Sequence, residues 1–170
     1  TQTTRISIHD LVHELTEFLG HTLPRSIQIV TELPEEPMQV LGDQNQLHQA
    51  LLNLALNARD AMPNGGQLIF CAEKLNRTEM ERIERITDPS DHWLCLSVTD
   101  TGEGMTEEIL NRIFEPFFTT KMVGKGSGMG LAMVYSIVRN HNGHIDVESD
   151  VTRGSIFRMF LPLAEPEKLS

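Results

Sequence analysis

The stretch Asn53-Leu-Ala-Leu-Asn-Ala-Arg-Asp60 carries a polar and an apolar face within two helical turns. Asn53, Asn57 and Asp60 follow the spacing i, i+4 and i+7, which places them on one side of a helix. The leucine and alanine residues between them form the apolar stripe that a core-facing helix shows. Such a polar face either meets solvent or lines a ligand site, and this stretch by itself leaves both interpretations open.

The elements around this stretch predict an α+β fold. Asp43 is a favourable N-cap, so the helix is predicted to begin there and to end near Met62, before Pro63-Asn-Gly-Gly66. Residues 76–91 are polar and predict a surface excursion with one or two helical turns. The pattern predicts a two-layer α/β sandwich with a mixed sheet. Predicted strands span residues 5–8, 26–33, 67–74, 93–100, 145–149 and 155–163, and further helices span residues 9–21, a short segment capped by Thr106, and residues 128–141.

Length and composition indicate one globular domain over residues 1–170. The formal net charge of −10 argues against nucleic-acid partners and against direct contact with an anionic membrane surface. No apolar run approaches the ~18 residues of a membrane-spanning helix. Cys71 and Cys95 lie in apolar strand-like runs and predict reduced core thiols rather than a disulfide. Because the chain begins with Thr1 and not with Met, a longer parent protein is expected.

Glycines concentrate in one part of the chain, since 6 of the 12 fall between Gly102 and Gly130. Glycine costs backbone entropy, so this clustering suggests a backbone that approaches a ligand. The common phosphate loops do not fit. A Walker loop needs glycine where Thr119 stands, and a Rossmann fingerprint needs glycine where Met129 or Leu131 stands.

Three further stretches suggest a different ligand site. In Val98-Thr-Asp-Thr-Gly-Glu-Gly-Met105 a carboxylate ends a strand and can accept from an exocyclic amine, although a simple Asp-Thr-Gly turn explains the residues equally well. Ile113-Phe-Glu-Pro-Phe-Phe-Thr-Thr-Lys121 has three phenylalanines beside a proline. Gly124-Lys-Gly-Ser-Gly-Met-Gly-Leu131 leads into a helix whose free N–H groups favour anions.

Together and in this order, the four stretches resemble the ATP-binding catalytic domain of sensor histidine kinases, in the GHKL ATPase superfamily. The resemblance covers residues 41–162 and is nearest to the nitrogen-regulator and hybrid-sensor versions. It implies a Bergerat-type fold, with a mixed five-stranded sheet on about three helices and a lid at about residues 114–127. The matching motifs are the N box at 53–60, the first glycine box at 100–104, the F box at 114–118, the second glycine box at 126–130 and a Gly-Ser strand motif at 154–157.

The resemblance also implies ATP as substrate and Mg²⁺ as cofactor, with Asn57 as the metal ligand. Asp100 would accept from the adenine N6 amine, Ser155 would help through an ordered water, and Gly102 and Gly104 would let the backbone pass the adenine. The implied ATP-binding residues are Asn53, Asn57, Asp60, Asp100, Gly102, Gly104, Met105, Phe117, Phe118, Lys121, Lys125, Gly126, Ser127, Gly128, Met129, Gly130, Leu131 and Ser155.

The sequence departs from the superfamily in two ways. ATP-hydrolysing members carry a glutamate, the general base, where this chain has Asn53, and an amide cannot take a proton at neutral pH. His13-Glu14 lacks the proline of a phosphoacceptor motif and lies too close to the N box. The phosphoacceptor histidine is therefore expected on a dimerisation domain N-terminal to residue 1, no residue here is expected to be catalytic, and all seven histidines are expected to be structural.

The sequence therefore predicts the cytoplasmic catalytic domain of a two-component histidine kinase, in a parent protein that can be membrane-attached. Its expected partners are its own dimerisation domain and a response regulator receiver domain. Two alternatives stay open: a GHKL ATPase that hydrolyses ATP, and a non-catalytic nucleotide-binding interaction module.

Overall fold

The computed structural model describes residues 3–116, 118 and 130–166. Within these ranges a five-stranded sheet has the order β2-β4-β5-β7-β6, and β1 and β3 form a separate antiparallel pair. The β2–β4 pair is parallel and the other pairs of the large sheet are antiparallel, so the sheet is mixed as predicted. The strands are β1 (Thr4–Ser7), β2 (Ile27–Glu32), β3 (Gln39–Gly42), β4 (Gly66–Asn76), β5 (His92–Asp100), β6 (His144–Asp150) and β7 (Gly154–Pro162).

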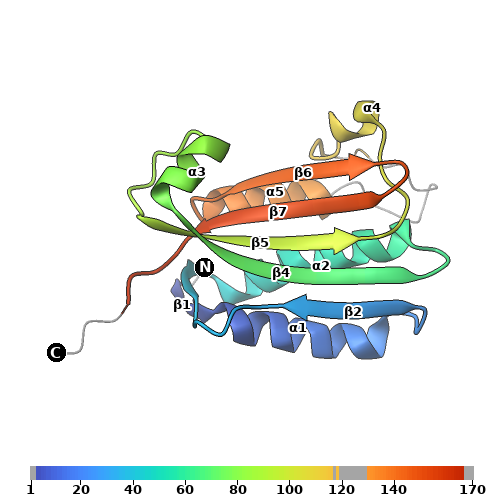
Figure 1. Ribbon diagram of the computed structural model, residues 1–170, viewed down its shortest axis with the longest axis horizontal. Helices are drawn as coiled ribbons and strands as arrows, with labels where there is room; N and C mark the ends of the chain where they lie inside the picture. Colours follow the sequence, from blue (N-terminus) through green and yellow to red (C-terminus); the bar gives the residue numbers. More distant parts are fainter. Residues whose placement is uncertain (1–2, 117, 119–129, 167–170) are drawn as a thin grey trace.

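Three long helices lie on one face of the sheet, which gives the predicted two layers (Figure 1). The helices are α1 (Ile8–Thr22), α2 (Gln44–Ala61), α3 (Arg77–Ile83), α4 (Glu107–Leu110) and α5 (Gly130–Asn140). The short α3 packs Met80 against Trp93 and Phe160, on the opposite face and at one end of the sheet. No helix in the described ranges is long and apolar enough to cross a membrane.

Local sequence explains where α2 begins. The Asp43 side chain accepts a hydrogen bond from the Gln46 N–H at 3.1 Å, as the predicted N-cap requires. The cap receives a second, non-local bond, because the Asp43 N–H donates to Nε2 of His141 at 3.0 Å. Nε2 of His141 accepts this bond, and Nδ1 lies 2.7 Å from the carbonyl of Ile137, to which it donates.

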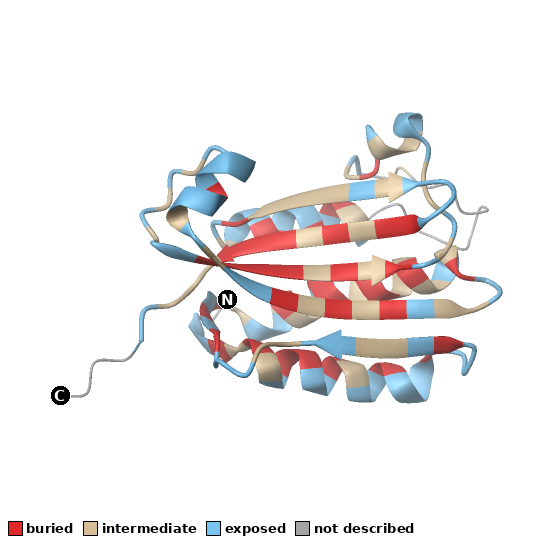
Figure 2. Ribbon diagram, viewed as in Figure 1, coloured by how far each residue is buried: buried red, intermediate tan, exposed pale blue. Residues whose placement is uncertain are grey.

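The main core lies between α1, α2, α5 and the sheet. Leu51 and Leu54 of α2 pack with Phe70, Leu96 and Met159 of the central strands, and all five are buried. Figure 2 shows buried residues concentrated on β5, β7 and the sheet-facing sides of α1 and α2. Fully burying one such side chain contributes about 1.5–3 kcal/mol, so this layer holds α2 at a fixed height above the sheet.

The structure differs from the predicted elements in a few places. β3 was not predicted, because a strand of four residues gives little periodicity and depends on its non-local partner β1. The first strand and helix each begin one residue earlier than predicted. Cys71 and Cys95 are both free thiols on the sheet face away from the three long helices, but Cys71 is only half-buried, whereas Cys95 is buried in the cluster with Met80 of α3.

Candidate nucleotide-binding site

The central acceptor of the site is Asp100, at the end of β5 and only 3% exposed. Its Oδ1 accepts from the Gly102 N–H at 3.0 Å, and the backbone of Ser155 also bonds to the carboxylate. Burial raises the pKa of Asp100 above its ordinary range, while these two hydrogen bonds oppose that rise. Asp100 and Ser155 pair across β5 and β7 and are the two fully buried polar residues of the described chain. A buried carboxylate beside a buried hydroxyl is well suited to accept hydrogen bonds from a ligand.

The loop after β5 is held tightly between α2 and the β6–β7 turn. A Cβ on Gly102 would lie 2.1 Å from the Ala61 carbonyl oxygen, and a Cβ on Gly104 would lie 1.7 Å from that of Asp150. The Glu103 N–H donates to the Ala61 carbonyl at 2.8 Å. Both glycines are therefore required by contacts within the protein itself. Their predicted role in passing the adenine stays a prediction.

The polar face of α2 points toward the start of α5. Nδ2 of Asn53 donates to the Gly130 carbonyl at 3.4 Å, and its Oδ1 accepts from Gln49 at 2.9 Å. Asp60 is paired with Arg59 at 3.1 Å. Within the described ranges the Asn57 side chain has no hydrogen-bond partner, so its amide is available to a ligand. The contact between Asn53 and Gly130 brings the N box next to the end of the second glycine box.

Asn57 also fits the implied magnesium ion. The described residues contain no group of three or more His, Cys, Asp or Glu that could hold a metal. Mg²⁺ bound with a nucleotide keeps waters and phosphate oxygens and takes only one or two protein ligands. A single uncommitted amide oxygen is sufficient for that role, whereas Oδ1 of Asn53 already accepts a hydrogen bond.

The described phenylalanines of the F box contact α5, β7 and Arg112. The Phe114 ring lies 5.6 Å from Tyr135 of α5 and 6.5 Å from Phe157 of β7, centroid to centroid. The Arg112 guanidinium lies 4.7 Å from the centroid of Phe118 and its Nε lies 2.9 Å from Glu115. Since Glu115 pairs with Arg112, this cation is partly neutralised before any phosphate arrives.

Several predicted site residues lie outside the described ranges. Gly130 begins α5 and is exposed, Leu131 and Met105 are half-buried, and most of the predicted lid cannot be compared with the structure. The predicted residues outside the described ranges are Phe117, Lys121, Lys125, Gly126, Ser127, Gly128 and Met129.

One residue next to the site was missed by sequence reasoning. Ser149, at the end of β6, bonds to the backbone of Met105 and to the hydroxyl of Ser155. A lone serine gives no motif, but direct pairing across two adjacent strands places Ser149 beside Ser155, which is itself paired with Asp100. The strand register, and not a sequence motif, therefore identifies Ser149 as part of the site.

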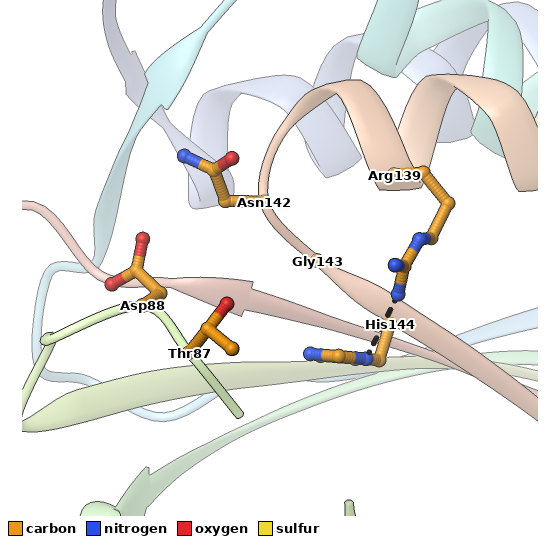
Figure 3. Close-up of a pocket in the computed structure, with 6 residues that line it drawn as sticks. All are labelled: Thr87, Asp88, Arg139, Asn142, Gly143 and His144. Carbon is orange, nitrogen blue, oxygen red and sulfur yellow. Dashed lines mark hydrogen bonds between the residues drawn. The ribbon is translucent and has the colours of Figure 1, made fainter. Parts of the chain in front are cut away.

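A separate cavity of about 230 Å³ lies at the far end of α5 (Figure 3). None of the predicted site residues lines it. Arg139 donates to Nδ1 of His144 at 3.2 Å there, and burial lowers the pKa of His144. Asn142 has a φ of 60° and follows the last turn of α5, where the Gly143 N–H donates to the Val138 carbonyl. The lining residues are Thr87, Asp88, Arg139, Asn142, Gly143 and His144.

Comparison with known proteins identifies the class. Residues 42–165 match the family described as histidine kinase-, DNA gyrase B- and HSP90-like ATPases, and the chain belongs to that family. The chain is 36% identical over 163 residues to the sensor kinase CckA of Brucella abortus, which covers 96% of this chain and 17% of that protein. The family predicted from the motifs is therefore confirmed.

Solved structures narrow the class to histidine kinases. The nucleotide-free catalytic domain of the histidine kinase ThkA is 26% identical with a TM-score of 0.77, covering 95% of this chain and 96% of that one. Full-length ShkA in complex with AMPPNP is 25% identical with a TM-score of 0.77, covering 98% of this chain and 32% of that one. The predicted fold, a two-layer sandwich of the histidine kinase catalytic type, is confirmed.

Proposed function

We propose that this chain is the ATP-binding catalytic domain of a two-component sensor histidine kinase. In this role it donates the γ-phosphoryl group of ATP to a histidine on a separate dimerisation domain. The observation that carries the proposal is the buried acceptor pair Asp100 and Ser155, which lies on the same side of the sheet as the N-box amides of α2. The AMPPNP bound to the similar ShkA structure supports an ATP-type ligand.

Each described residue has a distinct task in this proposal. Asp100 and Ser155 accept from the adenine amine, so they select the base. The amide oxygen of Asn57 holds Mg²⁺, which neutralises charge on the phosphates. Asn53 fixes the start of α5, where Gly130 begins a helix whose N-terminal dipole favours the phosphate groups. The chain thus supplies positioning and charge neutralisation for phosphoryl transfer.

The chemistry of Asn53 favours transfer over hydrolysis. A hydrolase needs a general base for water, and in the superfamily that base is a glutamate at this position. The Asn53 amide cannot take a proton at neutral pH, and its oxygen already accepts from Gln49. ATP held here is therefore expected to persist until an acceptor histidine is presented.

The partners follow from the same proposal. The acceptor histidine belongs to a dimerisation domain that we expect before residue 1, and the phosphoryl group passes on to a response regulator receiver domain. Because ATP is cytoplasmic, we place the domain in the cytoplasm.

A labelling experiment tests this function. The chain alone and a longer form with the preceding residues are incubated with Mg²⁺ and γ-labelled ATP. We expect little phosphate release from the chain alone and acid-labile label on a histidine of the longer form. Steady phosphate release by the chain alone would instead show a hydrolysing ATPase. Nucleotide binding without either reaction would show a non-catalytic module.

A further inference from the structure

Three segments meet at the hydroxyl of Ser149. The Met105 N–H donates to Ser149 Oγ at 2.7 Å, Ser149 Oγ donates to the Gly154 carbonyl at 3.1 Å, and Ser149 Oγ lies 2.7 Å from Ser155 Oγ. A serine hydroxyl has one hydrogen and two acceptor positions. Because the Gly154 carbonyl can only accept, the network that forms both bonds has Ser149 donating to Gly154 and Ser155 donating to Ser149. All hydrogen-bonding positions of Ser149 are then filled.

This arrangement fixes the direction of the Ser155 hydroxyl. With its hydrogen directed at Ser149, Ser155 Oγ presents only lone pairs to other partners, and no further hydrogen bond to Ser155 Oγ is found among the described residues. Asp100, Ser155 and Ser149 are directly paired in one row across β5, β7 and β6, which lie side by side (Figure 1). Directly paired residues share one face of a sheet, so these three side chains are neighbours on the helix-covered face.

Ser149 also holds the loop that carries Met105. The loop approaches the β6–β7 turn so closely that a Cβ on Gly104 would overlap the Asp150 carbonyl. The Met105–Ser149 hydrogen bond is the polar link across this contact. A change at Ser149 therefore acts on both walls of the proposed adenine site, the loop and the β7 hydroxyl.

We infer that Ser149 is a positioning residue that sets base selectivity by keeping Ser155 an acceptor. This inference rests on the proposed ATP function. Adenine offers an N6 amine, which suits the two acceptors Asp100 and Ser155 directly or through water. Guanine offers a carbonyl oxygen at that position, which needs a donor. While Ser149 holds the Ser155 hydrogen, neither Asp100 nor Ser155 offers a donor to guanine, so this pair disfavours it.

The test compares ATP and GTP affinities of wild type and Ser149→Ala by competition with a fluorescent nucleotide. Without Ser149 the Ser155 hydroxyl can rotate and donate, so we expect the ATP-over-GTP preference to fall about threefold to tenfold. Ser97→Ala is the matched control, because Ser97 lies on β5 with its side chain on the opposite face of the sheet, where its hydroxyl donates to the Cys71 carbonyl. This control should keep the wild-type preference.

A double-mutant cycle separates positioning from simple stabilisation. Ser149→Ala in a Ser155→Ala background should leave the base preference unchanged relative to Ser155→Ala alone, because the hydroxyl it acts on is gone. If Ser149→Ala does not fold, the isosteric pair Ser149→Thr and Ser149→Val replaces it, and only the threonine should keep the preference.

The outcomes distinguish this inference from the function on which it rests. Wild-type protein that binds no nucleotide contradicts the proposed function. Wild-type protein that prefers ATP, together with a Ser149→Ala variant that loses thermal stability but keeps the full preference, overturns the role of Ser149 alone.

Discussion

At the scale of single residues, the site depends on atoms that are not already satisfied by the protein. The Asn57 amide has no partner among the described residues, whereas Asn53, four residues earlier, is bonded at both ends of its amide. Asp100 keeps a desolvated carboxylate with two backbone donors on it. The same residue types thus have different roles because their surroundings differ.

Replacing Asn57 with alanine should weaken ATP binding in the presence of Mg²⁺ by about tenfold to a hundredfold. The substitution removes the metal's protein ligand but no hydrogen bond within the described structure, so stability should change by less than about 0.5 kcal/mol. Competition binding and urea denaturation measure the two effects. Asn140→Ala, at the exposed end of α5, is the control. Equal ATP affinities for both variants would remove Asn57 from the metal site.

Asp100 should make the site prefer ATP to GTP by about tenfold to a hundredfold, because guanine would leave a buried acceptor unpaired. Asp100→Asn can turn an NH₂ donor toward the guanine oxygen. This variant should therefore bind ATP more weakly and show a smaller difference between its ATP and GTP affinities. Parallel ATP and GTP competition assays measure the ratio. A folded variant with the wild-type ratio would show that Asp100 only stabilises its turn.

The Cys95 thiol should be unreactive in the folded protein. Burial, with a further contribution from Glu73, raises its pKa from 9.0 to about 12. At pH 8 its thiolate fraction is then about a thousandfold below that of an ordinary thiol, and alkylation followed by mass spectrometry should slow in proportion. The unfolded thiol ionises first, so its ionisation should lower stability as pH rises from about 9 to 12. Labelling of native Cys95 as fast as in urea would contradict this.

At the scale of elements, sequence patterns predicted the features of helices and strands that depend on residues close in sequence. The Asp43 cap and the two faces of α2 follow from local spacing, and the structure confirms them. β3, the His141 bond to Asp43 and the role of Ser149 depend on residues distant in sequence. Local patterns cannot reveal such contacts. The fold was therefore predictable and the supporting contacts were not, while the ligand-binding roles of the motif residues stay predictions.

The docking of the loop after β5 can be tested with two glycines. Gly104→Ala should destabilise the protein by about 1–3 kcal/mol, because its Cβ would lie 1.7 Å from a backbone oxygen. Gly20→Ala is the matched control, since Gly20 lies inside α1 with nothing within 4 Å of its Cβ position. That change should stabilise by about 0.5–1 kcal/mol. Urea denaturation that ranks the two variants equally would contradict the close approach of the loop.

At the scale of the whole molecule, the described part of the site forms where the ends of several elements meet. Hydrogen bonds join α2 to the start of α5 and to the loop after β5, and join that loop to the end of β6. The chain carries a formal charge of −10, so a nucleotide polyphosphate approaches against a net negative field. Removing Mg²⁺ is therefore expected to weaken ATP binding more than removing its protein ligand Asn57 does.

The most direct test is a calorimetric titration of ATP into the chain, with Mg²⁺ and again with EDTA, at constant ionic strength. The account predicts saturable one-to-one binding that is tighter with Mg²⁺. In Asn57→Ala the increase in ATP affinity caused by Mg²⁺ should be smaller. Absence of saturable binding under both conditions, with the protein folded, would contradict the central claim that this surface is an ATP site.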